Sequence, residues 1–232
     1  MIKEAIILAG GLGTRLRPVV SDVPKCMAPV AGRPFISFLI DYLVKHGINR
    51  FIYAIGYKGE MIQEYISKHH PDLYNSFSFE EEPLGTGGAI KLACTLCTDE
   101  NVIVLNGDTM FKIDMEELAA FHNSKGSQCT LCLKPMQHFN RYGVVELNSN
   151  HSIRNFKEKK AYETGLINGG VYVLNTKQFL EEALPEKFSF ETDYLQTFYQ
   201  KVKMFALIQD KYFIDIGIPE DFERAQTELA TV

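Results

Sequence analysis

The chain has 232 residues, of which 46% are hydrophobic and 23% charged, and this is the size and composition of one globular α/β domain. Its formal net charge of −5 argues against a nucleic-acid binder, because phosphate-backbone binding usually requires a basic excess. No stretch approaches the roughly 20 apolar residues of a membrane span, and the short apolar run near the N-terminus ends in glycine rather than in a signal-peptide pattern. We therefore expect a cytoplasmic domain whose partners are neither nucleic acid nor membrane.

A glycine-rich loop follows the first predicted strand. The apolar run at residues 5–8 predicts a buried strand, which stops abruptly at Gly10, Gly11 and Gly13. Glycine removes the side chain that would block a ligand, and successive free N–H groups form a concavity that binds anions. Positive charge follows at Arg15 and Lys25. The loop is therefore predicted to hold the phosphates of a nucleotide.

Two common phosphate-binding patterns do not match this loop. A dinucleotide-binding fingerprint needs a third glycine where Leu16 stands. A Walker A loop needs Lys-Ser or Lys-Thr after a correctly spaced glycine, and the sequence has neither there. Three glycines alone are also compatible with an ordinary tight turn.

Strand and helix patterns alternate through the first half of the chain. Strands are predicted at 5–8, 51–55, 77–79 and 102–105, and helices at 34–46, 61–70, 87–96 and 115–122. Repeated βα units predict an α/β fold with a doubly wound, mainly parallel, Rossmann-like sheet. Ligands bind such sheets at the carboxyl ends of the strands, where the glycine loop and Asp108 both fall.

The second half is richer in strands, which predicts an antiparallel insertion. The predicted strands are 129–133, 142–147, 152–156, 167–174, 204–208 and 212–214. Helices are expected near 176–183 and 191–201, and a last helix opens at Pro219, which suits the first helical position. We expect a single domain over 1–232.

The five cysteines include two identical Cys-Thr-Leu-Cys tetrapeptides, which raise the question of a zinc site. The segment between Cys97 and Cys129 is longer than the about 15–20 residues usual between such pairs. Cys129 and Cys132 also fall in a predicted strand, where residues i and i+3 face opposite sides. We favour buried structural cysteines over zinc.

Several further motifs follow in order, and together with the glycine loop they carry a resemblance to a known family. They lie at residues 14–18, 24–25, 82–89, 106–108, 142–143, 158–159, 168–170 and 215–219. The series resembles the sugar-1-phosphate nucleotidyltransferases, also called NDP-sugar pyrophosphorylases, over nearly the whole chain. Residues 17–25 look most like the guanylyltransferases that act on D-glycero-α-D-manno-heptose 1-phosphate in surface polysaccharide synthesis. Cys26 departs from the proline usual there, and residues 212–214 lack a tryptophan that many members carry.

The resemblance implies that a sugar 1-phosphate attacks the α-phosphorus of GTP and releases pyrophosphate, with Mg²⁺ as cofactor. Catalysis of such a reaction is mostly positioning and charge neutralisation. Catalytic roles are expected for Arg15, Lys25 and Asp108, and metal binding for Asp108 and Asp215. Taken singly, Asp108 could cap a turn and Asp215 a helix.

The resemblance also implies two binding regions, a nucleotide-binding part over about 1–125 and a sugar-binding part over about 126–215. The nucleotide is expected at Leu8, Gly10, Gly11, Gly13, Thr14, Glu80, Glu81, Gly85, Gly87 and Asp108. The sugar phosphate is expected at Tyr142, Gly143, Glu158, Lys159, Asn168 and Gly169. Either Glu80 or Glu81 could accept hydrogen bonds from guanine.

Other functions stay open on the sequence. They are a mannose-1-phosphate guanylyltransferase, a uridylyl- or thymidylyltransferase acting on a hexose 1-phosphate, and a non-catalytic nucleotide-sensing subunit. A homo-oligomer is equally open.

Overall fold

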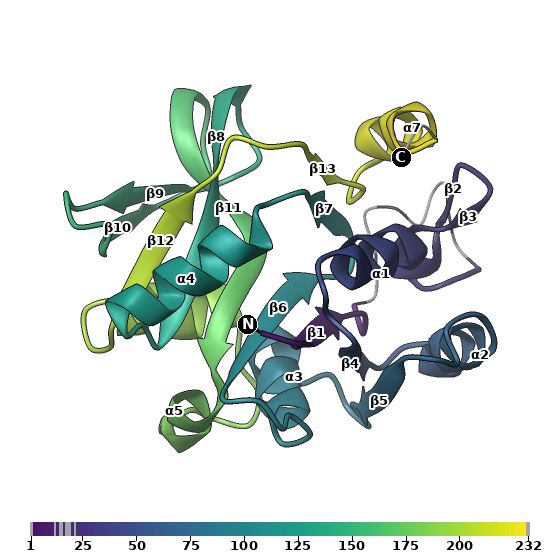
Figure 1. Cartoon of the computed structure of the whole chain (residues 1–232). Helices are drawn as coiled ribbons and strands as arrows, with labels where there is room; N and C mark the ends of the chain where they lie inside the picture. Colours follow the sequence, from purple (N-terminus) through teal and green to yellow (C-terminus); the bar gives the residue numbers. More distant parts are fainter. Residues whose placement is uncertain (1, 12, 14–15, 17–19, 21, 231–232) are drawn as a thin grey trace.

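The computed structural model describes residues 2–11, 13, 16, 20 and 22–230. Its centre is a parallel block of strands in the order β5 (Tyr74–Phe79), β4 (Arg50–Ile55), β1 (Glu4–Leu8) and β6 (Asn101–Asn106). The chain runs outward from β1 to β5 and then returns to place β6 on the other side of β1 (Figure 1). The direction of winding therefore reverses between β1 and β6, and ligands bind at such a point in open α/β sheets.

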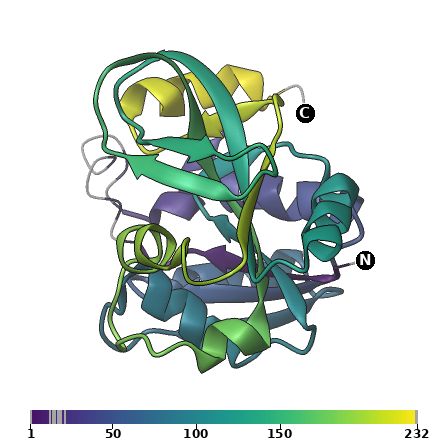
Figure 2. The ribbon, with the colours of Figure 1, turned by 90° about the vertical axis from the view of Figure 1, so that its left-hand side faces the viewer.

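An antiparallel extension continues this sheet beyond β6. The long strand β11 (Tyr162–Asn175) pairs with β6 and with β8 (Cys129–Phe139), and β12 (Met204–Ile208) runs parallel to β8. The short strands β9 (Val144–Leu147) and β10 (Ile153–Lys157) branch from β11. Figure 1 shows these strands on the side opposite β4 and β5, and Figure 2 shows the residues around β8 and β11 arching over the upper part of the molecule. We call strands β8 to β12 and the loops between them the arm.

Helices cover both faces of the sheet, as a doubly wound fold requires. Helices α1 (Phe35–Lys45), α2 (Gly59–His69), α4 (Met115–Lys125) and α7 (Pro219–Glu228) contribute to one hydrophobic core. Helices α3 (Gly85–Cys94) and α5 (Thr176–Glu181), with the π-helical segment η2 (Phe190–Leu195), contribute to the other. Along β1, Ile7 packs in the first core and Ile6 in the second, because successive strand residues face opposite sides. The predicted fold class is confirmed.

Small elements outside the main sheet shape its ligand-binding edge. Strand β7 (Thr109–Phe111) follows β6 directly and pairs with β13 (Phe213–Asp215) in an antiparallel ribbon. The 3-10 turn η1 (Lys25–Met27) leads into the hairpin of β2 (Pro29–Val30) and β3 (Arg33–Pro34). None of β2, β3 and β7 was predicted, because each is too short to show a hydrophobic period.

Other differences from the predicted elements lie in the second half. Strands β8 and β11 are several residues longer than expected, because each continues beyond its apolar run through more polar residues. The expected helix at 191–201 is wrong in form: it is η2 followed by the short α6 (Gln196–Phe198). Among the described residues, no helix is long and apolar enough to cross a membrane.

Candidate active site

A series of adjoining cavities follows the carboxyl edge of the sheet. The glycine-loop cavity, of about 460 Å³, is lined by residues of 8–11, 54–57, 79–83 and 85–89. The middle cavity, of about 190 Å³, shares Leu8, Gly11 and Thr86 with it. The arm cavity, of about 450 Å³, shares Asn106 and Glu191 with the middle cavity. Together they form one trough from the parallel strands to the arm.

The glycine-loop cavity has a carboxylate held in a fixed position. Glu80 follows β5, and its Oε2 accepts a hydrogen bond of 2.8 Å from the Leu84 N–H. Its Oε1 lies so near Gly10 that a Cβ on Gly10 would stand 2.7 Å away. Burial raises the pKa of Glu80, and the hydrogen bond from Leu84 opposes this shift. The partly exposed rings of Tyr57 and Phe79 also line this cavity, together with Glu81.

Two aspartates and a lysine meet at the middle of the trough. Strand β13 pairs with β7 so that Asp215 stands opposite Thr109, and this register brings Asp215 beside Asp108. The Lys25 ammonium forms an ion pair with Asp108 Oδ2 and lies 3.9 Å from Asp215 Oδ1. All three side chains are largely buried: the exposed fraction is 12% for Lys25, 29% for Asp108 and 18% for Asp215. Burial, and then the neighbouring Asp108, raise the pKa of Asp215.

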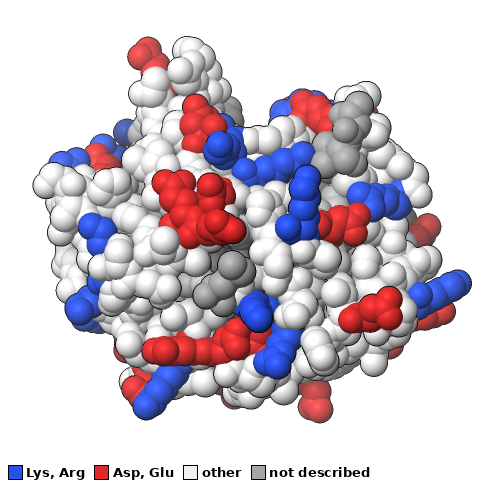
Figure 3. All heavy atoms as spheres, in the orientation of Figure 1, with Lys and Arg blue, Asp and Glu red and all other residues white. Residues whose placement is uncertain are grey.

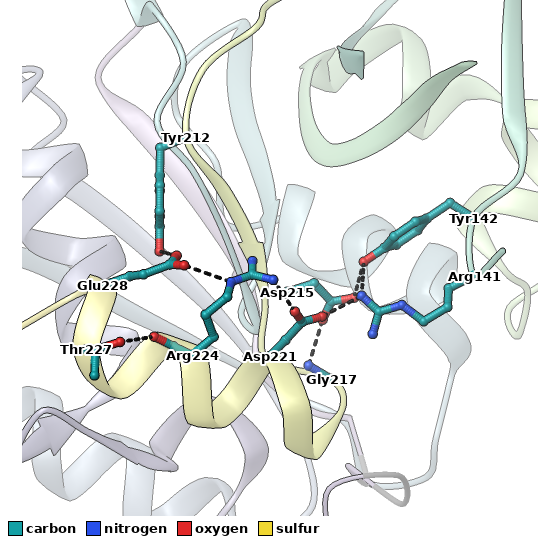
Figure 4. Close-up of polar contacts among 9 residues, drawn as sticks. All are labelled: Arg141, Tyr142, Tyr212, Asp215, Gly217, Asp221, Arg224, Thr227 and Glu228. Atoms are coloured by element: carbon teal, nitrogen blue, oxygen red, sulfur yellow. Dashed lines mark hydrogen bonds and ion pairs between the residues drawn. The ribbon is translucent and has the colours of Figure 1, made fainter. Parts of the chain in front are cut away.

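A polar network from α7 and the arm orients Asp215 (Figure 4). Tyr142 donates from its hydroxyl to Asp215 Oδ2 at 3.2 Å, and the Gly217 N–H donates to Oδ1 at 2.8 Å. The Arg141 guanidinium pairs with the buried Asp221 of α7 and donates to the Tyr142 hydroxyl at 3.3 Å. Asp215 is thereby tied both to the final helix and to the arm.

The arm cavity is the most polar part of the trough. It is lined by side chains that include Tyr142, Glu158, Lys159, Asn168, Tyr172, Glu191 and Asp215. Asn168 is held by its own neighbours: it donates to the Tyr172 hydroxyl at 2.8 Å and accepts from the Gly170 N–H at 3.1 Å. Glu158 and Lys159 are exposed at the rim. Across the face seen in Figure 3, acidic and basic side chains lie interspersed.

The structure brings most of the residues predicted for the site to this trough. Leu8, Gly10, Gly11, Glu80, Glu81 and Gly85 line the glycine-loop cavity, and Gly143 and Gly169 line the arm cavity. Gly13, in the left-handed region with φ +58°, packs on Lys25, since a Cβ there would stand 3.0 Å from the Lys25 Cβ. Arg15 and Thr14 lie outside the described residues.

The second glycine cluster has a packing function that the sequence did not reveal. A Cβ on Gly87 would stand 2.1 Å from the Phe188 ring, and one on Gly85 would stand 2.5 Å from the Phe188 carbonyl oxygen. Gly87 is buried under Phe188, whereas Gly85 is exposed and reaches the cavity. The glycines therefore allow the segment before η2 to lie against the start of α3.

Sequence reasoning missed Glu191, which lines both the middle and the arm cavities. Its spacing carries no motif, because only the tertiary fold places η2 beside the glycines of α3. Cys26 lines the middle cavity and is buried, which raises the pKa of its thiol to about 12. Cys129 and Cys132 pack in different hydrophobic cores, as expected for residues i and i+3 of a strand.

Comparison with known proteins identifies the class. The model of the nucleotidyl transferase family matches residues 4–232, and the chain belongs to this family. The chain is 49% identical to a D-glycero-alpha-D-manno-heptose 1-phosphate guanylyltransferase of Aneurinibacillus thermoaerophilus, over 97% of this chain and 98% of that protein. It is 47% identical to the protein of the same name from Campylobacter jejuni, over 94% and 96% of the two chains. A mannose-1-phosphate guanyltransferase of Schizosaccharomyces pombe is 32% identical over 94% of this chain and 62% of its own length.

The solved structures agree with this assignment. HddC from Yersinia pseudotuberculosis, complexed with GMP-PN, superposes with a TM-score of 0.88 at 37% identity and covers 98% of this chain and 100% of its own. The family resemblance that the ordered motifs indicated is thus confirmed.

Proposed function

We propose that this chain transfers GMP from GTP to D-glycero-α-D-manno-heptose 1-phosphate and so forms GDP-heptose and pyrophosphate. A phosphate oxygen of the sugar 1-phosphate would form a bond to the α-phosphorus, and the bond from that phosphorus to the departing pyrophosphate would break. The observation that carries the proposal is the continuous trough, which joins the glycine loop to the arm through Lys25, Asp108 and Asp215. Identities of 49% and 47% to heptose 1-phosphate guanylyltransferases over nearly full length support this sugar.

Guanine would occupy the glycine-loop cavity. The N1–H and N2–H of guanine are adjacent donors, and a carboxylate accepts both. Glu80 suits this task better than Glu81, because the Leu84 N–H fixes its orientation and leaves Oε1 toward Gly10. The flat rings of Tyr57 and Phe79 at the same cavity could stack on a base.

The phosphates would lie in the middle cavity. Apart from its chain neighbours, no atom of the described residues lies within 4 Å of the position that a Cβ on Gly11 would take, and we expect its backbone to be open to a ligand. The Lys25 ammonium would turn from the aspartates to the triphosphate and neutralise the charge of the departing pyrophosphate. We assign Arg15 the same task on the grounds of the motif alone.

The carboxylates where the middle and arm cavities adjoin fit Mg²⁺, since Asp108 lines the middle cavity and Asp215 the arm cavity. Asp108 and Asp215 present carboxylate oxygens around a cationic nitrogen, and Mg²⁺ prefers carboxylate oxygens completed by phosphates and water. When bound, the ion would neutralise charge on the reacting phosphates. Tyr142 and the Gly217 N–H would hold Asp215 in place for it.

The sugar ring would occupy the arm cavity, with its phosphate at the boundary to the middle cavity. Lys159 would bind its phosphate, while Glu158 and Asn168 would bind sugar hydroxyls. The prediction of a sugar-binding part over about 126–215 is supported by the many lining residues of this cavity that come from that range.

Pyrophosphate release tests the proposal with GTP, ATP, UTP or dTTP and with heptose, mannose or glucose 1-phosphate. We expect the highest kcat/KM for GTP with the manno-configured heptose 1-phosphate. A higher value with mannose 1-phosphate, or with UTP or dTTP, would replace the proposed substrates. GTP binding by calorimetry with no turnover of any pair would identify a nucleotide-sensing subunit instead.

A further inference from the structure

Glu191 occupies a special place in the trough. It is the second residue of η2, and it lines both the middle cavity and the arm cavity. Asn106 is the other residue that these two cavities share. Under the proposed function, the sugar 1-phosphate has its ring in the arm cavity, and its phosphate lies at this boundary, facing the GTP phosphates of the middle cavity.

The Glu191 carboxylate is oriented from the nucleotide side of the trough. The Thr86 hydroxyl, at the start of α3, donates to Glu191 Oε2 at 2.8 Å. The same hydroxyl accepts from the Phe190 N–H at 2.9 Å, so its direction is fixed. The Ser189 hydroxyl adds a longer bond of 3.3 Å to the same Glu191 oxygen.

The other oxygen of this carboxylate has unused acceptor capacity. Among the described residues, no donor reaches Glu191 Oε1, and no cation forms an ion pair with Glu191. Glu191 is partly buried, and a carboxylate withdrawn from water needs donors to its lone pairs. A phosphate cannot supply them and would repel the carboxylate. A sugar hydroxyl can donate a charge-assisted hydrogen bond.

The position of Glu191 between the two cavities indicates which sugar hydroxyl it would bind. In any sugar 1-phosphate, the hydroxyl closest to the phosphate along the ring is the one on C2. Glu191 stands where the phosphate region gives way to the sugar region. We propose that Glu191 accepts a hydrogen bond from the C2 hydroxyl of the sugar 1-phosphate and makes the enzyme specific for the configuration at C2. This inference rests on the proposed function.

The ribose of GTP is the competing source of hydroxyls. Thr86 lines the glycine-loop cavity as well as the middle cavity, whereas the described lining of the glycine-loop cavity does not include Glu191. This favours the transferred sugar over the ribose as the partner of Glu191.

The experiment compares kcat/KM for the manno-configured heptose 1-phosphate, its C2 epimer and its 2-deoxy analogue, each with GTP. We expect the wild-type enzyme to prefer the natural sugar over the 2-deoxy analogue by about 10- to 100-fold, the value of one hydrogen bond to a charged group. Glu191→Ala should reduce this preference to nearly one and leave the KM for GTP unchanged. Glu191→Gln, which keeps an amide oxygen, should retain part of it.

Asp193→Asn is the matched control. Asp193 lies on the same segment, and its carboxylate accepts from the Ser189 N–H at 2.7 Å, as an amide oxygen could. This variant should keep the wild-type preference. Thermal unfolding of every variant separates loss of fold from loss of selectivity.

The possible results separate the two proposals. A wild-type enzyme that turns over none of these sugars refutes the proposed function. A wild-type enzyme that is active, with a Glu191→Ala variant that keeps the full preference, refutes only the inference. If Glu191→Ala instead loses the preference for GTP over 2′-deoxy-GTP, the carboxylate binds ribose and the inference is wrong.

Discussion

Replacing Lys25 with methionine removes the cation that lies between Asp108 and Asp215. At 3.9 Å and an effective dielectric constant of about 20, the attraction between Lys25 and Asp215 alone is about 4 kcal/mol. Part of that is offset because the variant no longer withdraws an ammonium from water, since the Lys25 side chain is only 12% exposed. We therefore expect Lys25→Met to lower the free energy of unfolding by only about 1–3 kcal/mol.

The expected effect on catalysis is larger. If Lys25 neutralises the departing pyrophosphate, its loss removes a preorganised donor that acts in the transition state, which typically costs about 10²–10³ in kcat. The assay is pyrophosphate release at saturating substrates, with urea unfolding of the same preparation. Lys45→Met, on the exposed last turn of α1, is the matched control and should keep the wild-type kcat. A Lys25→Met enzyme with kcat within about threefold of wild type would refute the assignment.

Three further predictions concern other parts of the chain. Gly11→Ala should leave the melting temperature unchanged and raise the KM for GTP about tenfold, because no atom of the described residues beyond its chain neighbours lies within 4 Å of the new Cβ, which would meet the bound nucleotide. Tyr142→Phe removes a donor to Asp215 and should raise the Mg²⁺ concentration needed for half-maximal rate about tenfold. Buried His122 has a pKa lowered by burial to about 4, below the about 6.5 of the unfolded chain. The stabilising contribution of neutral His122 is therefore complete above pH 6.5, and the free energy of unfolding falls by up to about 3 kcal/mol as the pH falls toward 4. In His122→Gln, the free energy of unfolding measured in urea should depend less on pH over that range.

Each of these predictions has a contrary outcome. A Gly11→Ala protein with wild-type GTP affinity would place the phosphates elsewhere. A Tyr142→Phe enzyme with an unchanged Mg²⁺ requirement would mean that the hydroxyl does not orient the metal ligand. Equal slopes of stability against pH for wild type and His122→Gln would show that His122 does not titrate in this range.

The sequence by itself determined the parallel half of the fold. Most of the predicted strands and helices there are long enough to show a hydrophobic pattern, as in the apolar runs of β1 and β6 and the apolar stripe of α1. Such patterns reflect which side of an element is buried, and this is a local property of the chain. The ordered motifs likewise identified the family before any geometry was known.

The tertiary structure decided how the distant parts of the site meet. Asp215 lies beside Asp108 because of the register between β13 and β7, and β7 is too short to have been predicted. Glu191 reaches the trough because Gly85 and Gly87 let Phe188 pack against α3. Both depend on contacts between segments roughly a hundred residues apart, and no local pattern encodes such a contact. The sequence therefore specified the chemistry of most groups at the site, while the packing of η2, β7 and β13 determined which of them face one another.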